Sequence, residues 1–158
     1  MNNHAFIDAQ NVHLGIKSLG WKIDWKRFRV YLKDKYNVTD AYMFLGFVSG
    51  NQKLYSHLQK SGFILVFKPL IFNEDGTVKG NCDADLVLHA ILQIDKYDKA
   101  IIATSDGDFY SLVKHLYEND KLLMVLSPYV NTCSKLLRKE AKEKIYSMHN
   151  LKKKIGLK

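Results

Sequence analysis

Residues 100–109 read Ala-Ile-Ile-Ala-Thr-Ser-Asp-Gly-Asp-Phe, and this junction is the strongest indication of fold in the chain. Its first half is apolar throughout rather than alternating, which is typical of a strand covered on both faces in a parallel sheet. Its second half places Asp106 and Asp108 directly after that strand, around a glycine that permits a tight strand-to-helix turn. The sequence therefore predicts a buried parallel strand with acidic side chains at its carboxyl end.

Buried-strand character recurs along the chain and alternates with amphipathic helical patterns. The expected strands are His4–Asp8, Thr39–Phe47, Phe63–Phe67, Lys99–Thr104 and Leu122–Ser127. The expected helices are Asp24–Tyr36, Gln52–Lys60, Ala84–Ile94, Phe109–Glu118 and Thr132–Lys144. Such alternation predicts right-handed crossovers in a doubly wound sheet. We therefore expect an α/β fold, a single three-layer, Rossmann-like domain whose mainly parallel sheet has five or six strands in the order 3-2-1-4-5.

Two regions lie outside this alternation. Between Lys68 and Cys82, the tight-turn sequence Asn73-Glu74-Asp75-Gly76 indicates a small hairpin flanked by Leu70–Phe72 and Thr77–Lys79. At the other end, residues 1–148 are assigned to one domain, and residues 149–158 to a basic tail that is part of it or appended to it. The tail contains Lys152–Lys154, which would serve either to bind a polyanion or as a soluble chain end.

The composition indicates a soluble globular protein with a basic surface. The chain has 158 residues, of which 47% are apolar and 25% are charged. Its net charge is +8, from 24 Lys and Arg against 16 Asp and Glu. This charge favours a polyanionic partner, most commonly nucleic acid, although surface lysines can also serve solubility alone.

The cysteines and the apolar runs bear on the compartment. Cys82 and Cys133 show no CxxC spacing, no disulfide framework and no partners at zinc-ligand spacing, which favours a reducing setting. No signal peptide opens the sequence and no apolar run approaches the length of a membrane span. We therefore expect a cytoplasmic protein with no membrane partner.

Polar and acidic side chains recur where strands end and where helices begin. They are Asp8 and Asn11, Asp83 and Asp85, and Asp106 and Asp108. In the predicted order, the first and fourth strands are neighbours at the topological switch point, so Asp8 and Asp106 should be adjacent in space. Thr104 and Ser105 add hydroxyls that could orient a water or a carboxylate. Carboxylates this close repel each other unless a cation lies among them, which indicates a divalent-metal site.

Each of these signals also has a simpler interpretation as a helix cap. Asp8 or Asn11 could cap a helix after the first strand, and Asp108 could cap one after an Asp-Gly turn. Asp83 and Asp85 both suit a helix N-terminus, where acidic residues are favoured. Because residues two apart on a helix do not face the same way, we expect one of this pair to reach the metal and the other to cap the helix or position water.

Four segments together resemble the NYN domain, the LabA-like branch of the PIN-like metal-dependent ribonucleases. They are Phe6–Val12, Lys79–Asp85, Thr104–Phe109 and Ser134–Ala141, and the resemblance spans nearly the whole chain. It implies a PIN-like fold, an acidic site that binds Mg²⁺ or Mn²⁺, and hydrolysis of RNA phosphodiester bonds. By motif position it assigns metal-binding or catalytic roles to Asp8, Asn11, Asp83 or Asp85, Asp106 and Asp108.

One residue departs from the family pattern. His89 lies where many relatives carry another Asp. It could hydrogen-bond back to Asp85, four residues earlier, or be a half-exposed helix histidine.

Basic and aromatic residues could complete an RNA-binding surface. The candidates for contact with the RNA backbone are Lys79, Lys68, Lys135, Arg138 and Lys139, with an ordinary solvated face as the alternative. Tyr129 and Phe109 could stack on bases, although core packing is the commoner role for such residues.

The sequence thus predicts a metal-dependent ribonuclease, of the endonuclease type, that acts on single-stranded or structured RNA. A bound cation would activate water and stabilise charge on the phosphate. Two alternatives stay open: a PIN-like module that binds RNA with little turnover, and a structure-specific DNA nuclease. The aromatic content is also compatible with a homodimer.

Other enzyme classes lack their required residues. Gln10 stands where a haloacid-type phosphatase needs a second Asp, and Lys68 stands where a receiver domain needs its phospho-acceptor. The sequence contains no Walker motif, no GxGxxG and no GxSxG.

Overall fold

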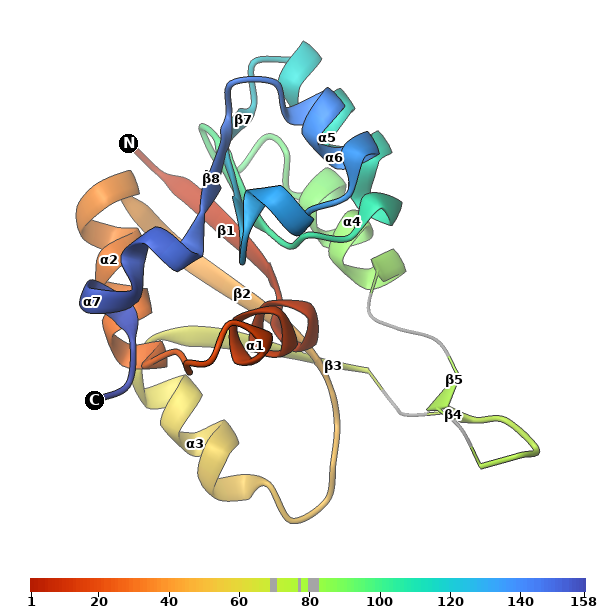
Figure 1. Cartoon of the computed structure of the whole chain (residues 1–158). Coiled ribbons are helices and arrows are strands. Elements are labelled where there is room, and N and C mark those ends of the chain that lie inside the picture. Colours follow the sequence, from red (N-terminus) through yellow and green to blue (C-terminus); the bar gives the residue numbers. More distant parts are fainter. Residues whose placement is uncertain (69–70, 77, 80–82) are drawn as a thin grey trace.

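The computed structural model describes residues 1–68, 71–76, 78–79 and 83–158. Its centre is a six-stranded sheet in the order β3-β2-β1-β6-β7-β8, with every neighbouring pair parallel (Figure 1). The strands are β1 (Asn3–Asp8), β2 (Val38–Gly46), β3 (Phe63–Lys68), β6 (Ala100–Ala103), β7 (Leu122–Ser127) and β8 (Ile145–Ser147). This confirms the predicted α/β fold and strand order, with β8 as the sixth strand.

The sheet separates two hydrophobic cores because successive side chains of a strand point to opposite faces. In β1, Ala5 and Ile7 belong to one core, and Phe6 between them belongs to the other. All four residues of β6 are buried, as expected for a strand covered on both faces.

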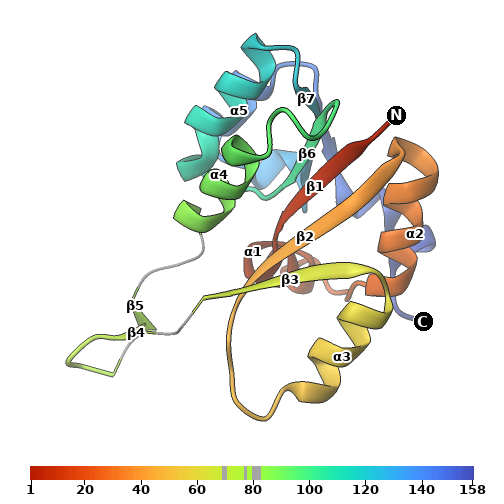
Figure 2. The same cartoon turned by 180° about the vertical axis from the view of Figure 1, so that it is seen from behind.

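Helices cover both faces, which makes the domain three-layered (Figure 2). On one face lie α1 (Ala9–Ser18), α2 (Trp25–Tyr36), α3 (Gln52–Lys60) and α7 (Lys152–Ile155). On the other lie α4 (Asp83–Leu92), α5 (Tyr110–Glu118) and α6 (Lys135–Ala141). The change of face occurs between β3 and β6, so the topological switch point lies between β1 and β6.

The structure differs from the sequence prediction in three places. Helix α1 was not among the expected helices, because Gly15 interrupts an otherwise regular buried spacing of Val12 and Ile16. The expected helix Thr132–Lys144 is shorter: a 3₁₀ turn, η2 (Val130–Thr132), precedes α6, and Lys142 ends it with a φ of 55°. Strand β8 is only three residues long, too short for a periodicity signal.

The predicted hairpin is present. Strands β4 (Ile71–Phe72) and β5 (Val78–Lys79) pair antiparallel and extend away from the main sheet (Figure 1). Leu70 and Thr77 of this prediction lie outside the described residues, as do Gly80, Asn81 and Cys82 of the Lys79–Asp85 segment.

The C-terminal residues lie on the same face of the sheet as α2, and α7 packs against that helix. They follow β8 through a 3₁₀ turn, η3 (Met148–Leu151), into α7, where Ile155 is fully buried and its carbonyl accepts a hydrogen bond from the Asp24 amide at 2.7 Å. The side chains of Lys152–Lys154 are exposed. No helix among the described residues combines the length and the apolar character that a membrane span requires.

We predict that Gly15→Ala destabilises the protein although alanine favours helix. A Cβ at this position would lie 2.6 Å from Cγ of Pro128, so α1 could not keep its close approach to the segment after β7. Overpacking typically lowers the free energy of unfolding by about 1–3 kcal/mol, whereas the higher helix propensity of alanine raises it by at most about 1 kcal/mol. Urea denaturation should therefore show a lower free energy of unfolding. Lys17→Ala, exposed on the same helix, is the control, and an unchanged value for Gly15→Ala would contradict the packing argument.

Candidate metal centre

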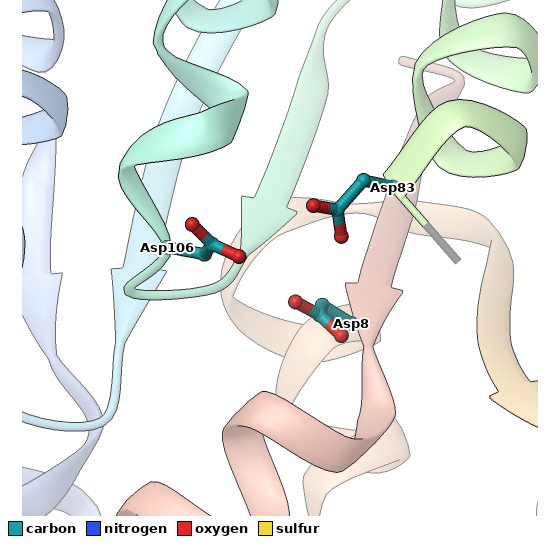
Figure 3. A group of neighbouring side chains, drawn as sticks. All are labelled: Asp8, Asp83 and Asp106. Atoms are coloured by element: carbon teal, nitrogen blue, oxygen red, sulfur yellow. The ribbon is translucent and has the colours of Figure 1, made fainter. Parts of the chain in front are cut away.

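Three carboxylates from distant parts of the chain converge at the carboxyl ends of β1 and β6 (Figure 3). Asp8 is the last residue of β1, Asp83 is the first residue of α4, and Asp106 follows β6. One oxygen from each lies within 4.8 Å of the others, and all three residues are half-buried. The predicted adjacency of Asp8 and Asp106 is therefore confirmed, and of the pair Asp83 and Asp85, Asp83 joins the group.

Asp8 occupies the N-cap position of α1 but forms no side-chain capping hydrogen bond. Instead its Oδ2 accepts a hydrogen bond from Thr104 Oγ1 at 3.1 Å. Burial raises the pKa of Asp8 from its ordinary 3.8 to about 6 with help from the charge of Asp106, while the Thr104 hydroxyl and the Asn11 amide act in the opposite direction. The contributions of Thr104 and of the Asn11 backbone amide do not offset the energetic cost of burying this carboxylate beside Asp106.

Asp106 both caps a helical turn and belongs to the cluster. Its Oδ1 accepts a hydrogen bond from the Asp108 amide at 2.9 Å, which starts the 3₁₀ turn η1 (Gly107–Phe109). Its own amide donates to Thr104 Oγ1 at 3.1 Å. Thr104 therefore ties Asp8 to Asp106, the orienting role expected for a hydroxyl here. The sequence alternative that Asp108 caps the helix after this turn is therefore wrong: Asp106 caps η1, and it also belongs to the cluster.

Asn11 holds the loop after β6. Its Oδ1 accepts hydrogen bonds from both the amide and the hydroxyl of Ser105, at 2.9 and 3.0 Å. The side-chain oxygen predicted to serve the reaction therefore links α1 to the segment that carries Asp106. Asn11 thus contacts the loop of Asp106 through Ser105.

Gly107 allows α6 to approach the same loop. A Cβ on this glycine would lie 3.0 Å from the Cβ of Ser134 and closer still to its hydroxyl. Ser134 caps α6 by accepting from the Leu137 amide at 3.5 Å, and its amide donates to the Ser105 carbonyl at 3.2 Å. Sequence reasoning missed this role of Ser134. A serine before a helical run signals the cap, but nothing local reveals its contact with Gly107.

Asp83 reaches the cluster because of the register of α4. Leu86 and Ala90 are buried, and Asp83 precedes them by three and seven residues, so all three share the face turned toward the sheet. This helical spacing is a signal that could have distinguished Asp83 from Asp85. Asp85 is half-buried on α4 and lies outside the three-carboxylate group. Asp108 is exposed and lines a shallow hollow with Asp83.

The predicted RNA-binding residues are distributed over several elements. Lys135 and Lys139 are exposed on α6, the helix that packs beside η1. Arg138 is half-buried, and its Nε forms no hydrogen bond within the described structure. Lys68 ends β3, and Lys79 lies in β5. Only the α6 residues are shown to be on an element in contact with the loop of Asp106.

The two aromatic candidates for base stacking, and His89, pack against other residues of the protein. Phe109 is fully buried in the core formed with α5 and α6, so the stacking alternative is wrong for it. Tyr129 is half-buried and packs edge-on against His149 at 5.6 Å between ring centroids. His89 packs edge-on against Phe44 at 5.2 Å, and within the described structure it is not bonded to Asp85.

The donor set fits a hard divalent cation. Every member of the group offers carboxylate oxygen, the donor that Mg²⁺ and Mn²⁺ prefer, and none offers nitrogen or sulfur. Among the described lysines and arginines, none forms an ion pair with Asp8 or Asp106. A bound cation would offset the repulsion between the carboxylates of Asp8 and Asp106.

Comparisons with known proteins agree with this fold. The family model described as NYN domain matches residues 4–149. A crystal structure of a protein of unknown function from Vibrio parahaemolyticus superposes with a TM-score of 0.81 at 24% identity, over 99% of this chain and 96% of that one. No curated protein matches this sequence. At this identity the structural likeness shows the fold alone.

Asp8→Asn should stabilise the metal-free protein at neutral pH. Because the folded pKa of about 6 exceeds the ordinary 3.8, ionisation of Asp8 lowers stability as the pH rises through this interval. In EDTA at pH 7.5, the free energy of unfolding should rise by about 1–3 kcal/mol, and the difference should vanish near pH 4. Asp120→Asn, fully exposed and paired with Lys99, should give no such rise. An equal or lower value for Asp8→Asn at pH 7.5 would refute the assignment.

Asp83→Asn and Asp85→Asn should differ in metal affinity. Calorimetric titration with Mn²⁺ should show affinity weakened by roughly tenfold or more in Asp83→Asn, because a ligand is lost, and little change in Asp85→Asn. The two variants lie two residues apart on α4 and serve as each other's control. Equal losses in both would mean that the observed group does not define the site.

Proposed function

Since this chain belongs to the NYN domain family, whose members are generally nucleases of the PIN-like superfamily, we propose that it is a Mg²⁺- or Mn²⁺-dependent ribonuclease. The observation that carries the proposal is the convergence of Asp8, Asp83 and Asp106 at one sheet edge. Three carboxylates with oxygens within 4.8 Å of one another make a strong site for a hard cation. Without a bound cation, the same carboxylates would repel an anionic substrate.

The residues of the cluster and its neighbours would have separate roles in cation binding and orientation. Asp8, Asp83 and Asp106 would hold the cation, which supplies Lewis-acid chemistry by offsetting phosphate charge and acidifying water. Thr104 orients the Asp8 carboxylate, and Asn11 fixes the loop of Asp106 through Ser105. Asp108, which is exposed and lines one hollow with Asp83, would position a second ion or the attacking water.

RNA would be attracted by the basic surface rather than by the acidic cluster. The net charge of +8 supplies long-range attraction for a polyanion. Lys135 and Lys139 on α6 are exposed next to the Asp106 loop, at a position suited to backbone phosphates.

Cleavage of labelled nucleic acids tests this proposal. Single-stranded RNA, single-stranded DNA and duplex DNA are incubated with Mg²⁺, Mn²⁺ or EDTA. We expect EDTA-sensitive cutting of RNA, reduced roughly 100-fold or more in Asp8→Asn and Asp106→Asn because charge stabilisation at the phosphate is lost. Glu118→Gln, exposed at the end of α5, is the matched control.

The other outcomes distinguish the alternatives. Full RNA cleavage by both aspartate variants, folded by circular dichroism and free of contaminating nuclease, would contradict the site. Retention of RNA without cutting would indicate a binding module, and EDTA-sensitive cutting of DNA alone would indicate a DNA nuclease.

A further inference from the structure

A second concave site lies next to the carboxylate cluster, between α1 and α3. It is a hollow of about 520 Å³ at the carboxyl ends of β1 and β2, bounded there by Gln10 and Val48. This size is within the range of small-molecule sites. Helices α1 and α3 lie on the same face of the sheet (Figure 1), and the lining of the hollow begins at Ala9, the residue after Asp8 at the end of β1.

The body of the hollow is apolar and partly uncovered. Its floor includes Met43 and Leu58, which are buried core residues. Its walls include Leu14 and Leu54, whose side chains are 51% and 45% exposed. Apolar walls left open to solvent at a concave site are typical of a ligand-binding surface.

Two aromatic residues, Trp25 and Tyr55, line the hollow. Tyr55 is buried, and its hydroxyl accepts a hydrogen bond from the Val48 amide at 2.9 Å, which holds the segment between β2 and α3 in place. Trp25 is half-buried and is fixed by edge-on contacts with Phe28 and Phe63, each at 6.0 Å between ring centroids. These two aromatic side chains are therefore held in position by contacts within the protein.

Its polar groups are few and uncommitted. Gln10, His13 and Asn51 line the hollow, and none of their side chains forms a hydrogen bond with a described residue. Asn51 even stands at the N-cap of α3 without capping it. The described lining contains no Asp, Glu, Lys or Arg, so a charged ligand would find no counter-charge there.

We propose that this hollow binds one nucleobase of the RNA chain whose phosphate lies at the carboxylate cluster. A nucleobase is flat and apolar in its body, neutral, and carries hydrogen-bonding groups on its edge, which matches apolar walls with three free polar side chains. Ala9 and Gln10 line the hollow and follow Asp8 directly in the chain. An RNA strand with a phosphate at the cluster would therefore need only a short path to place a base in the hollow. This inference rests on the proposed function and assigns a base-recognition subsite to it.

The test compares RNA with a base-free analogue. Affinity for a labelled RNA oligonucleotide and for an abasic oligomer of equal length is measured by fluorescence anisotropy, in the Asp106→Asn background so that no cutting occurs. We expect roughly tenfold weaker binding of the abasic oligomer to the protein with an intact hollow. Affinity for RNA should fall by the same factor in the double variant His13→Ala and Asn51→Ala, and in Leu54→Ala. The affinity of these variants for the abasic oligomer should be unchanged.

Controls keep this result separate from the proposed function. Leu92→Ala, 71% exposed at the end of α4, should bind both oligomers unchanged. Equal affinity for RNA and for the abasic oligomer, or an equal loss for both in the hollow variants, would overturn the base subsite. Absence of RNA cleavage by the wild-type protein would instead overturn the nuclease proposal. Cleavage is a separate measurement from the binding that anisotropy reports.

Discussion

Electrostatic repulsion among Asp8, Asp83 and Asp106 is the constraint on which the rest of this structure depends. Three half-buried carboxylates have oxygens within 4.8 Å of one another, and no described lysine or arginine forms an ion pair with Asp8 or Asp106. The pKa of Asp8 is raised mainly by burial and further by the charge of Asp106. A fold retains such an arrangement when the cost is offset by a ligand, and a hard cation offsets it directly.

The fold imposes this proximity through its topology. Because β1 and β6 are neighbours at the switch point, the residues that follow them must meet, and helix α4 on the other face starts at the same edge with Asp83. Local hydrogen bonds then fix the orientation of the carboxylates. Thr104 joins Asp8 to Asp106, and Asn11 holds Ser105, the residue between Thr104 and Asp106. The geometry is thus prepared before any ligand binds.

Much of this could be predicted from local sequence, and the limits have physical causes. The apolar run before Asp106 identified β6 because a doubly covered strand has no polar face, and the order of the strands then brought Asp8 to it. Helix α1 was missed because Gly15 interrupts its pattern, although the glycine serves a contact with Pro128 far along the chain. The contact between Ser134 and Gly107 and the hollow between α1 and α3 depend on long-range packing, which no local pattern encodes.

The most direct test is anomalous diffraction from crystals grown with millimolar Mn²⁺. Should the account be right, an anomalous peak will lie between the carboxylates of Asp8, Asp83 and Asp106 and will disappear when EDTA replaces the metal. A map without a peak at that position, or with manganese bound only elsewhere on the molecule, would contradict it.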